Sequence, residues 1–202
     1  STYWDGSGDQ CLQSQIVSAV DLPNALTGQN GEHGTSIFAA GVAGLYLLKY
    51  WMACDGVPGF ALDMLTTHHV SLHGATVTYL ITCETEEQTR TNVLHMKAAL
   101  RILGYKLTSI DSTNETFCLK RNGYTLKVYH KTDFSHCVFA NEEVAETIKA
   151  RARCIIRIEV EMQGHYLRQR GWDALESWRK AYAEGRYELI FRELVRSLFH
   201  LE

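Results

Sequence analysis

Two stretches in the second half of the chain alternate polar and apolar residues at period two, which is the pattern of half-buried β-strands. They span residues 123–131 and 156–161. In the first, the alternation places Lys127, Tyr129 and Lys131 on one face. In the second it places Arg157, Glu159 and Glu161 on one face, with three aliphatic side chains opposite. If the two apolar faces share a core, these six polar side chains share the open face of one sheet.

The bulk composition is that of a soluble globular chain able to bury a sizeable core, with 202 residues of which 46% are hydrophobic and 21% charged. No apolar run reaches the roughly 18 to 20 residues of a membrane span, so we expect no membrane contact. Six cysteines without a Cys-x-x-Cys pair, and no visible signal peptide, favour reduced thiols in a cytoplasm. The chain starts at Ser1 rather than Met, which is consistent with an N-terminal truncation.

Charge is distributed unevenly although the net charge is only −3. Before Met96 the cationic side chains are Lys49 and Arg90, against nine acidic residues. From Met96 onward there are eighteen Lys and Arg against fourteen Asp and Glu. This asymmetry places positive charge on the half that carries Tyr129, as phosphate binding would require. Solvated helix faces of mixed charge would give the same pattern.

The remaining sequence predicts alternating strands and helices. We expect strands over residues 10–20, 75–83, 106–110, 115–120, 124–131 and 154–163, with 75–83 as a central strand. The Asn122-Gly123 pair predicts a hairpin. We expect helices over residues 35–52, 85–103 and 141–151. The first is capped by Thr35 and is apolar on most sides, so we expect it to be buried, and the second is capped by Thr85.

This order predicts an α+β domain with a central antiparallel sheet and helices packed mainly on one face. We expect a single domain over residues 1–202, with a helical C-terminal extension over residues 165–202.

Four blocks of residues resemble a known family. Thr125-Leu-Lys-Val-Tyr129-His-Lys131 resembles a block that holds a nucleophilic tyrosine, and Ile156-Arg-Ile-Glu159, followed by Tyr166-Leu167, resembles an Arg-x-Glu strand. Residues 26–35 and 76–84 are similar to two less specific blocks. The family is the rolling-circle replication initiators, or nickases, of filamentous phages and related plasmids, and the resemblance covers about residues 20–178.

The resemblance implies that Tyr129 attacks a DNA backbone phosphate at the origin, leaving a 5′-phosphotyrosine and a free 3′-hydroxyl. It implies Mg²⁺ or Mn²⁺ held by Glu159 and Glu161. Lys131 would lower the pKa of the phenol or hold the scissile phosphate. The residues expected to bind DNA are Lys127, Arg157, Lys120 and Arg121. The implied partners are single-stranded or hairpin origin DNA and a host helicase or polymerase, in the cytoplasm of a bacterial host.

Two positions depart from the family pattern. Ile81 stands where the family has a strand Asp, and Gln29 stands where it has a His. If those positions hold the metal, the substitutes are Glu84, Glu161, Asp63, His33 or His69, and a register shift within residues 76–84 is an alternative. Two rival functions remain open: a non-catalytic origin-binding protein of the same descent, and a protein-interaction domain. For Glu159 the competing interpretation is a cross-strand partner of Arg157 or Lys127.

Overall fold

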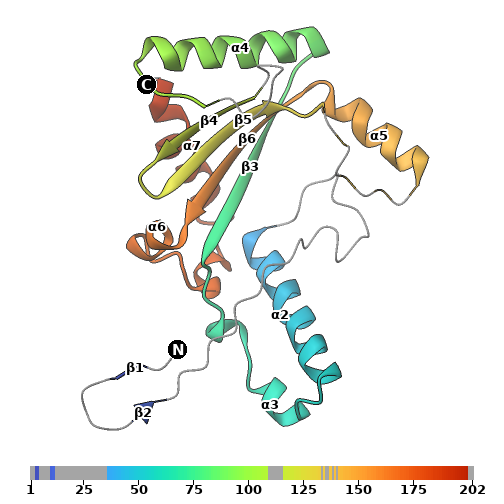
Figure 1. Cartoon of the computed structure of the whole chain (residues 1–202), viewed down its shortest axis with the longest axis vertical. Coiled ribbons are helices and arrows are strands. Elements are labelled where there is room, and N and C mark those ends of the chain that lie inside the picture. The colour runs from blue at the N-terminus through green and yellow to red at the C-terminus, as the bar shows by residue number, and fades with distance from the viewer. Residues whose placement is uncertain are drawn as a thin grey trace.

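A computed structural model describes residues 3–4, 10–11, 36–108, 116–132, 134, 137, 139 and 141–199. Within these residues the chain forms an α+β fold with a four-stranded antiparallel sheet and six α-helices (Figure 1). This confirms the predicted fold class and the antiparallel sheet. A separate two-stranded ladder pairs β1 (Tyr3–Trp4) with β2 (Gln10–Cys11). The rest of the predicted strand over residues 10–20 lies outside the described residues.

The strand order in the four-stranded sheet is β3-β6-β5-β4. The strands are β3 (Gly74–Thr82), β4 (Thr116–Arg121), β5 (Tyr124–His130) and β6 (Ile155–Gln163). The prediction that residues 75–83 form a strand is confirmed, but their central position is wrong, because β3 is at the edge of this sheet. β-Branched composition indicates a strand without indicating how many neighbours it has. Among the described strands β6 comes last in the sequence, yet it is one of the two inner strands of this sheet, beside β5.

A tight hairpin joins β4 to β5 at Asn122-Gly123, as predicted. Gly123 has a φ of +90°, a backbone conformation that residues other than glycine rarely adopt. A Cβ atom at this position would also lie 2.9 Å from the Cβ atom of Tyr166. Both observations explain why glycine stands at this turn.

The predicted strand over residues 106–110 is replaced by a single bridge. Thr108 and Cys118 exchange two backbone hydrogen bonds, of 3.0 and 2.8 Å, at the outer edge of β4. Residues 109 and 110 lie outside the described residues. The predicted strand is therefore wrong for residues 106 and 107, where the backbone is irregular.

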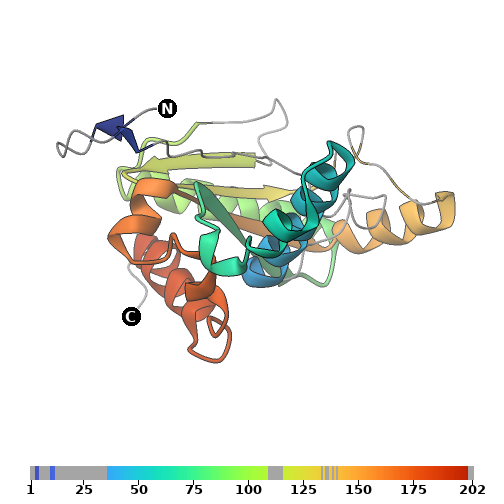
Figure 2. The same cartoon turned by 90° about the horizontal axis from the view of Figure 1, so that it is seen from below.

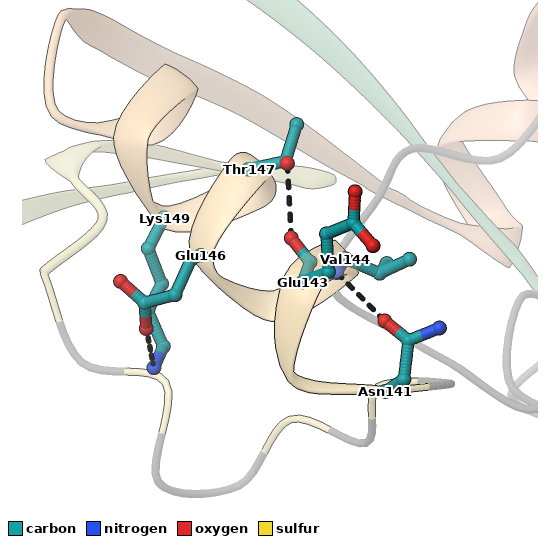
Figure 3. Close-up of polar contacts among 6 residues, drawn as sticks. All are labelled: Asn141, Glu143, Val144, Glu146, Thr147 and Lys149. Atoms are coloured by element: carbon teal, nitrogen blue, oxygen red, sulfur yellow. Dashed lines mark hydrogen bonds and ion pairs between the residues drawn. The ribbon is translucent and has the colours of Figure 1, made fainter.

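Two predicted helices are confirmed, and so is the predicted cap of the first of them, Thr85. In α4 (Glu86–Ile102) the Thr85 side chain accepts a hydrogen bond of 3.1 Å from the amide of Gln88. In α5 (Glu142–Ala152) the Asn141 side chain accepts one of 2.9 Å from the amide of Val144 (Figure 3). Such caps satisfy amide groups that have no partner within the helix.

One face of the sheet forms one side of the hydrophobic core. Side chains of α4 and α7 (Arg186–Leu194) form the other side. Figure 2 shows the C-terminal helices, in orange and red, below the sheet. The chain there forms α6 (Gly164–Gln169) and two 3₁₀ helices, η2 (Leu175–Trp178) and η3 (Arg196–Phe199). The fully buried core side chains include Val93, Leu100, Phe117, Leu126, Val128, Ile156, Ile158, Val160, Leu167, Trp178 and Ile190.

The apolar helix α2 (Ile37–Cys54) begins after the cap Ser36 and none of its residues is buried. The prediction of a buried helix is wrong, because α2 contacts η2, η1 and α3 without being enclosed by them. The Ile37 amide donates to the Tyr187 hydroxyl, and Gly41 packs so closely on Leu175 that a Cβ would lie 2.3 Å from its Cδ1. The rest of α2 extends away from the sheet toward α3 (Gly59–Asp63) (Figure 1), and η1 (Thr67–His69) follows α3 in the chain.

By length and composition alone, α2 is also a helix that could cross a membrane, with 18 residues of mean hydropathy 1.5. A core helix or a signal sequence meets the same criterion. This one helix therefore assigns no location to the protein.

Candidate functional site

The face of the sheet opposite the core carries most of the polar side chains that the sequence analysis singled out. We define this polar face by Lys120, Thr125, Lys127, Tyr129, Arg157, Glu159 and Glu161. The register between β5 and β6 places Tyr129 opposite Arg157, Lys127 opposite Glu159, and Thr125 opposite Glu161. The side chains of the same strands on the other face, among them Leu126, Val128, Ile156 and Ile158, are buried. The predicted sharing of one face is therefore confirmed for β5 and β6.

The hydroxyl of Tyr129 donates a hydrogen bond to Oε1 of Glu159. The two residues are diagonal neighbours, because Glu159 lies two positions from Arg157, the residue opposite Tyr129. Diagonal pairs on one face of an antiparallel ladder are within reach of long side chains. Both residues are half-buried. A phenol and a carboxylate from adjacent strands thus meet on a partly solvent-accessible surface.

The environment of Tyr129 keeps its phenol protonated. Burial and the hydrogen bond to Glu159 raise the pKa of Tyr129 to about 12, although Arg157 acts in the opposite direction. The guanidinium carbon of Arg157 lies 6.0 Å from the centre of the tyrosine ring, within the range of a cation–π contact. For Tyr129 to act as a nucleophile near neutral pH, a base must take its proton, and Glu159 is in hydrogen-bonding contact with it.

The second pair on the polar face joins Lys127 to Glu161 through an ion pair between half-exposed side chains. Burial lowers the pKa of Lys127, but the hydrogen bond and the charge of Glu161, together with the charge of Glu159, outweigh it and the net shift is upward. Lys127 is therefore a cation at any physiological pH. It lies opposite Glu159 and two residues from Tyr129.

Three further predicted residues are not part of this cluster of contacts. Lys120 is exposed on the polar face at the far end of β4, where it pairs with Thr125. Arg121 lies on the opposite face, with its guanidinium carbon 5.4 Å from the centre of the Tyr105 ring. The ammonium group of Lys131 lies 5.1 Å from the centre of the Phe134 ring, just beyond the end of β5.

Of the two roles predicted for Lys131, lowering the pKa of Tyr129 is wrong, and holding the scissile phosphate remains a prediction. The pKa of the phenol is raised rather than lowered, and the cation that acts against this rise is Arg157. The error came from extending the strand alternation through Lys131, whereas β5 ends at His130. The residue across the ladder, which a single sequence does not reveal, is the one that lies over the ring.

The donor chemistry of Glu159 and Glu161 fits an oxygen-ligated divalent ion. Both carboxylates lie on the same face of β6 and are half-exposed. Mg²⁺ is commonly bound by one or two carboxylates, with water and substrate phosphates completing its shell. Among the residues that the structure describes, no group of three or more His, Cys, Asp and Glu side chains forms a site. Protein ligands from the polar face would therefore number two, leaving most positions to phosphate and water.

The substituted position Ile81 lies on the opposite face from Glu159. Cross-strand register places Thr78 opposite Glu159 and Leu80 opposite Arg157, so the even-numbered residues of β3 share the polar face. A carboxylate at position 81 would point toward the helices. Of the alternative ligands, His69 bonds through Nδ1 to the backbone amide of Thr66, 3.1 Å away. Gln29 and His33 lie outside the described residues.

Sequence reasoning missed two buried residues beside this cluster, Thr116 and Cys118. They lie opposite Tyr129 and Lys127 on β4. Burial raises the pKa of the Cys118 thiol, so the thiol is neutral there. The signal was present in the sequence, because a two-residue Asn-Gly turn fixes the register of the hairpin and hence the residues opposite β5.

The chain matches no protein-family model, and neither a curated protein nor a solved structure is significantly similar to it. Its function is therefore inferred from the polar face together with the resemblance of its motifs.

Proposed function

We propose that this protein cleaves and rejoins single-stranded DNA at a replication origin, with Tyr129 as the nucleophile. The single observation that carries the proposal is the hydrogen bond from the Tyr129 hydroxyl to Glu159. A nucleophilic hydroxyl with a high pKa needs an adjacent base, and this pair supplies one. The resemblance to rolling-circle initiators adds the substrate: single-stranded or hairpin origin DNA, in the cytoplasm of a bacterial host, with a host helicase or polymerase as a further partner.

In the proposed reaction the phenolic oxygen of Tyr129 attacks a backbone phosphorus while Glu159 takes the phenolic proton. The bond that forms joins this oxygen to phosphorus. The bond that breaks joins phosphorus to the 3′-oxygen of the preceding nucleotide, which takes a proton from solvent and becomes a free hydroxyl. The products are a 5′-phosphotyrosine and a 3′-end. Because one phosphodiester replaces another, attack by a 3′-hydroxyl reverses the step and reseals the strand.

Two cations on the polar face would neutralise the phosphate during this reaction. Arg157 lies over the Tyr129 ring, and Lys127 lies two residues along the same strand. A guanidinium group can bind two phosphate oxygens at once, and an ammonium group acts as a compact charge. Negative charge that develops on the non-bridging oxygens is stabilised by such fixed positive groups. Lys120, exposed at the end of the same face, extends the positive surface along a bound strand.

Glu159 and Glu161 would hold the Mg²⁺ or Mn²⁺ that the resemblance implies. When bound, such an ion neutralises charge on the phosphate and on the leaving oxygen. A carboxylate has two oxygens, so acceptance of the Tyr129 hydrogen bond by Oε1 leaves the second oxygen of Glu159 for another contact. Glu161 would exchange its ion pair with Lys127 for the metal, which would release Lys127 toward phosphate.

A second candidate function is binding of origin DNA without cleavage. It is favoured by the raised pKa of Tyr129 and by the pairing of both carboxylates with groups of the same face. In that case Arg157, Lys127 and Lys120 would contact phosphates and Tyr129 would serve packing alone.

The two functions differ in whether a covalent adduct forms. The test incubates the protein with an end-labelled hairpin oligonucleotide and Mn²⁺, and denaturing electrophoresis then reveals any protein that carries labelled DNA. We expect an adduct with the wild type and none with Tyr129→Phe, while both bind the oligonucleotide equally. The matched control is Tyr182→Phe, at a side chain that is 82% exposed, and it should form the adduct normally.

The opposite outcomes are equally clear. Binding without any adduct, across origin-like hairpins and both metals, would support the non-catalytic function. An adduct that persists in Tyr129→Phe would rule out Tyr129 as the nucleophile. Binding that is absent at low salt, where phosphate contacts are strongest, would rule out both functions and leave a protein-interaction domain.

A further inference from the structure

The outer edge of β3 has backbone groups that no described strand pairs. The amide of Cys83 donates to the carbonyl of Cys154 across the ladder, at 2.8 Å, and these two residues continue the β3–β6 register. Odd-numbered residues of β3 therefore direct their backbone groups toward β6, since pairing alternates along an antiparallel strand. The even-numbered residues direct their amide and carbonyl groups away from the sheet: Gly74, Thr76, Thr78, Leu80 and Thr82.

This edge lacks the features by which proteins prevent edge-to-edge pairing. Lysine, proline and inward-pointing charges are the usual means, and residues 74–82 contain no charged residue and no proline. All nine residues pair continuously with β6, so no bulge interrupts the strand. Leu80 and Ile81, two consecutive residues near the end of β3, are 44% and 38% exposed. A long, apolar edge of this kind favours the addition of another strand.

A groove of about 950 Å³ runs along this edge, between β3 and α7. Residues from both faces of β3 line it, including Thr78 and Ile81, so it lies at the edge itself. The hydroxyl of Tyr79 donates to the carbonyl of Tyr187, and the Tyr79 ring packs edge-on against Phe191. These contacts fix α7 at its distance from the strand. The groove is thus a formed feature between two elements joined by specific contacts.

The charges along this groove change sign from one end to the other. Four exposed residues on the α7 side line it at intervals of four: Glu184, Glu188, Arg192 and Arg196. Glu188 and Arg192 are four residues apart on α7 and therefore lie on one side of it, whereas Glu184 precedes α7 and Arg196 begins η3. The groove is therefore acidic at the start of α7 and basic at its end. A peptide of one charge sign would match only half of it.

We propose that a second copy of this chain occupies this edge, with the two β3 strands antiparallel about a two-fold axis. Such an axis reverses the second copy, so the acidic end of each α7 stripe meets the basic end of the other. An isologous interface requires this kind of self-complementarity. The pairing would use the outward backbone groups of Thr76, Thr78, Leu80 and Thr82 and would join the two sheets into one.

The arrangement places both polar faces on the same side of the joined sheet, because the axis is perpendicular to it. Each Tyr129 is on the third strand from the interface, counting β3 as the first. Five strand spacings of about 4.8 Å then separate the two tyrosine strands, which is on the order of 24 Å. A dimer would present two copies of the site to one nucleic acid strand. This last consequence rests on the proposed function; the dimer itself does not.

Charge exchange on the groove tests the pairing. Sedimentation equilibrium of the full chain should show a reversible dimer. Glu188→Arg should weaken the dimer about tenfold or more, because each change acts twice in a symmetric interface. Arg192→Glu should do the same, and the double variant E188R/R192E should restore the wild-type dissociation constant. The matched control exchanges Glu146 and Lys149, an ion pair of 2.9 Å on α5 (Figure 3), and should change nothing.

Amide hydrogen exchange then locates the interface. At low concentration the outward amides of Thr78 and Leu80 should exchange quickly and those of Val77 and Tyr79 slowly. At concentrations that favour the dimer, Thr78 and Leu80 should become protected. The proposal would be overturned if the chain stayed monomeric at a protein concentration of about 100 μM, which is about 100 times a micromolar dissociation constant. It would also be overturned by a dimer whose Thr78 and Leu80 amides stay unprotected, or by single charge changes without effect. Adduct formation plays no part in either measurement, so failure of the proposed function leaves this test unaffected.

Discussion

The phenol of Tyr129 should make the stability of this protein depend on pH in the alkaline range. Its pKa in the folded protein is raised to about 12, whereas an unfolded chain has a tyrosine pKa of about 10. Below pH 10 both states hold the proton, and the contribution of Tyr129 to stability is fully present. Between pH 10 and 12 the unfolded state loses the proton while the folded state keeps it, so stability falls with rising pH.

The size of the effect follows from the shift. Two pKa units correspond to about 2.7 kcal/mol, and screening of a half-buried phenol by solvent reduces this to about 2 kcal/mol. At pH 9, Tyr129→Phe should cost about 1 to 2 kcal/mol, because Glu159 loses its hydrogen-bond donor. This difference between the wild type and the variant should shrink from pH 10 upward and vanish near pH 12.

Urea denaturation followed by circular dichroism at pH 9, 10, 11 and 12 measures both free energies of unfolding. Burial also raises the pKa of Tyr79, but that residue is present in both proteins and its effect cancels in the difference. For Tyr182→Phe, at an 82% exposed side chain, the free energy of unfolding should change with pH just as that of the wild type does. If Tyr129→Phe also runs parallel to the wild type from pH 9 to 12, the phenol is not held in its protonated form by this site.

Three further predictions concern the site and the scaffold. Glu159→Gln should slow adduct formation near neutral pH and make its rate rise about tenfold per pH unit, because the phenol must then ionise without a base; a pH–rate profile that stays flat would contradict this. Leu126→Ala, at a fully buried side chain, should cost about 2 to 5 kcal/mol of unfolding free energy, whereas Leu94→Ala, at a 45% exposed side chain, should cost far less in the same urea titration. Asn141→Ala removes the cap of α5 and should lower stability by about 1 kcal/mol, measured by thermal unfolding.

Local patterns in the sequence predicted what local physics determines. Strict alternation in β5 and β6 was enough to place Tyr129 and Glu159 on one face, because a period of two leaves no choice once one face is buried. The Asn122-Gly123 turn and the cap of α4 at Thr85 depend on a few adjacent residues, and both were predicted correctly. The shared polar face follows from these local rules alone.

What failed depends on neighbours distant in the sequence. The composition of residues 75–83 does not reveal that β3 has only one neighbouring strand in its sheet, β6. The apolar composition of α2 likewise does not reveal whether other elements pack around the helix and bury it. Lys120 and Arg121 were both expected to bind DNA, but adjacent residues in a strand point to opposite faces, so only Lys120 lies on the polar face. The high pKa of Tyr129 arises from burial and from Glu159, across the ladder. That value required the three-dimensional arrangement.

The position of β6 has a consequence for how the chain acquires its structure. The β4–β5 hairpin closes through a two-residue turn and can form early, since its ends are close in the sequence. The contacts of β3 with β6 join Gly74 to Gln163, across a loop of many tens of residues, and non-local pairing of this kind is slow. During synthesis β3 therefore leaves the ribosome well before its partner. Until residue 163 has been synthesised, β6 cannot pair with β3 or with β5, the strand that carries Tyr129. A nascent chain that stops earlier therefore exposes unpaired strand edges and is prone to self-association.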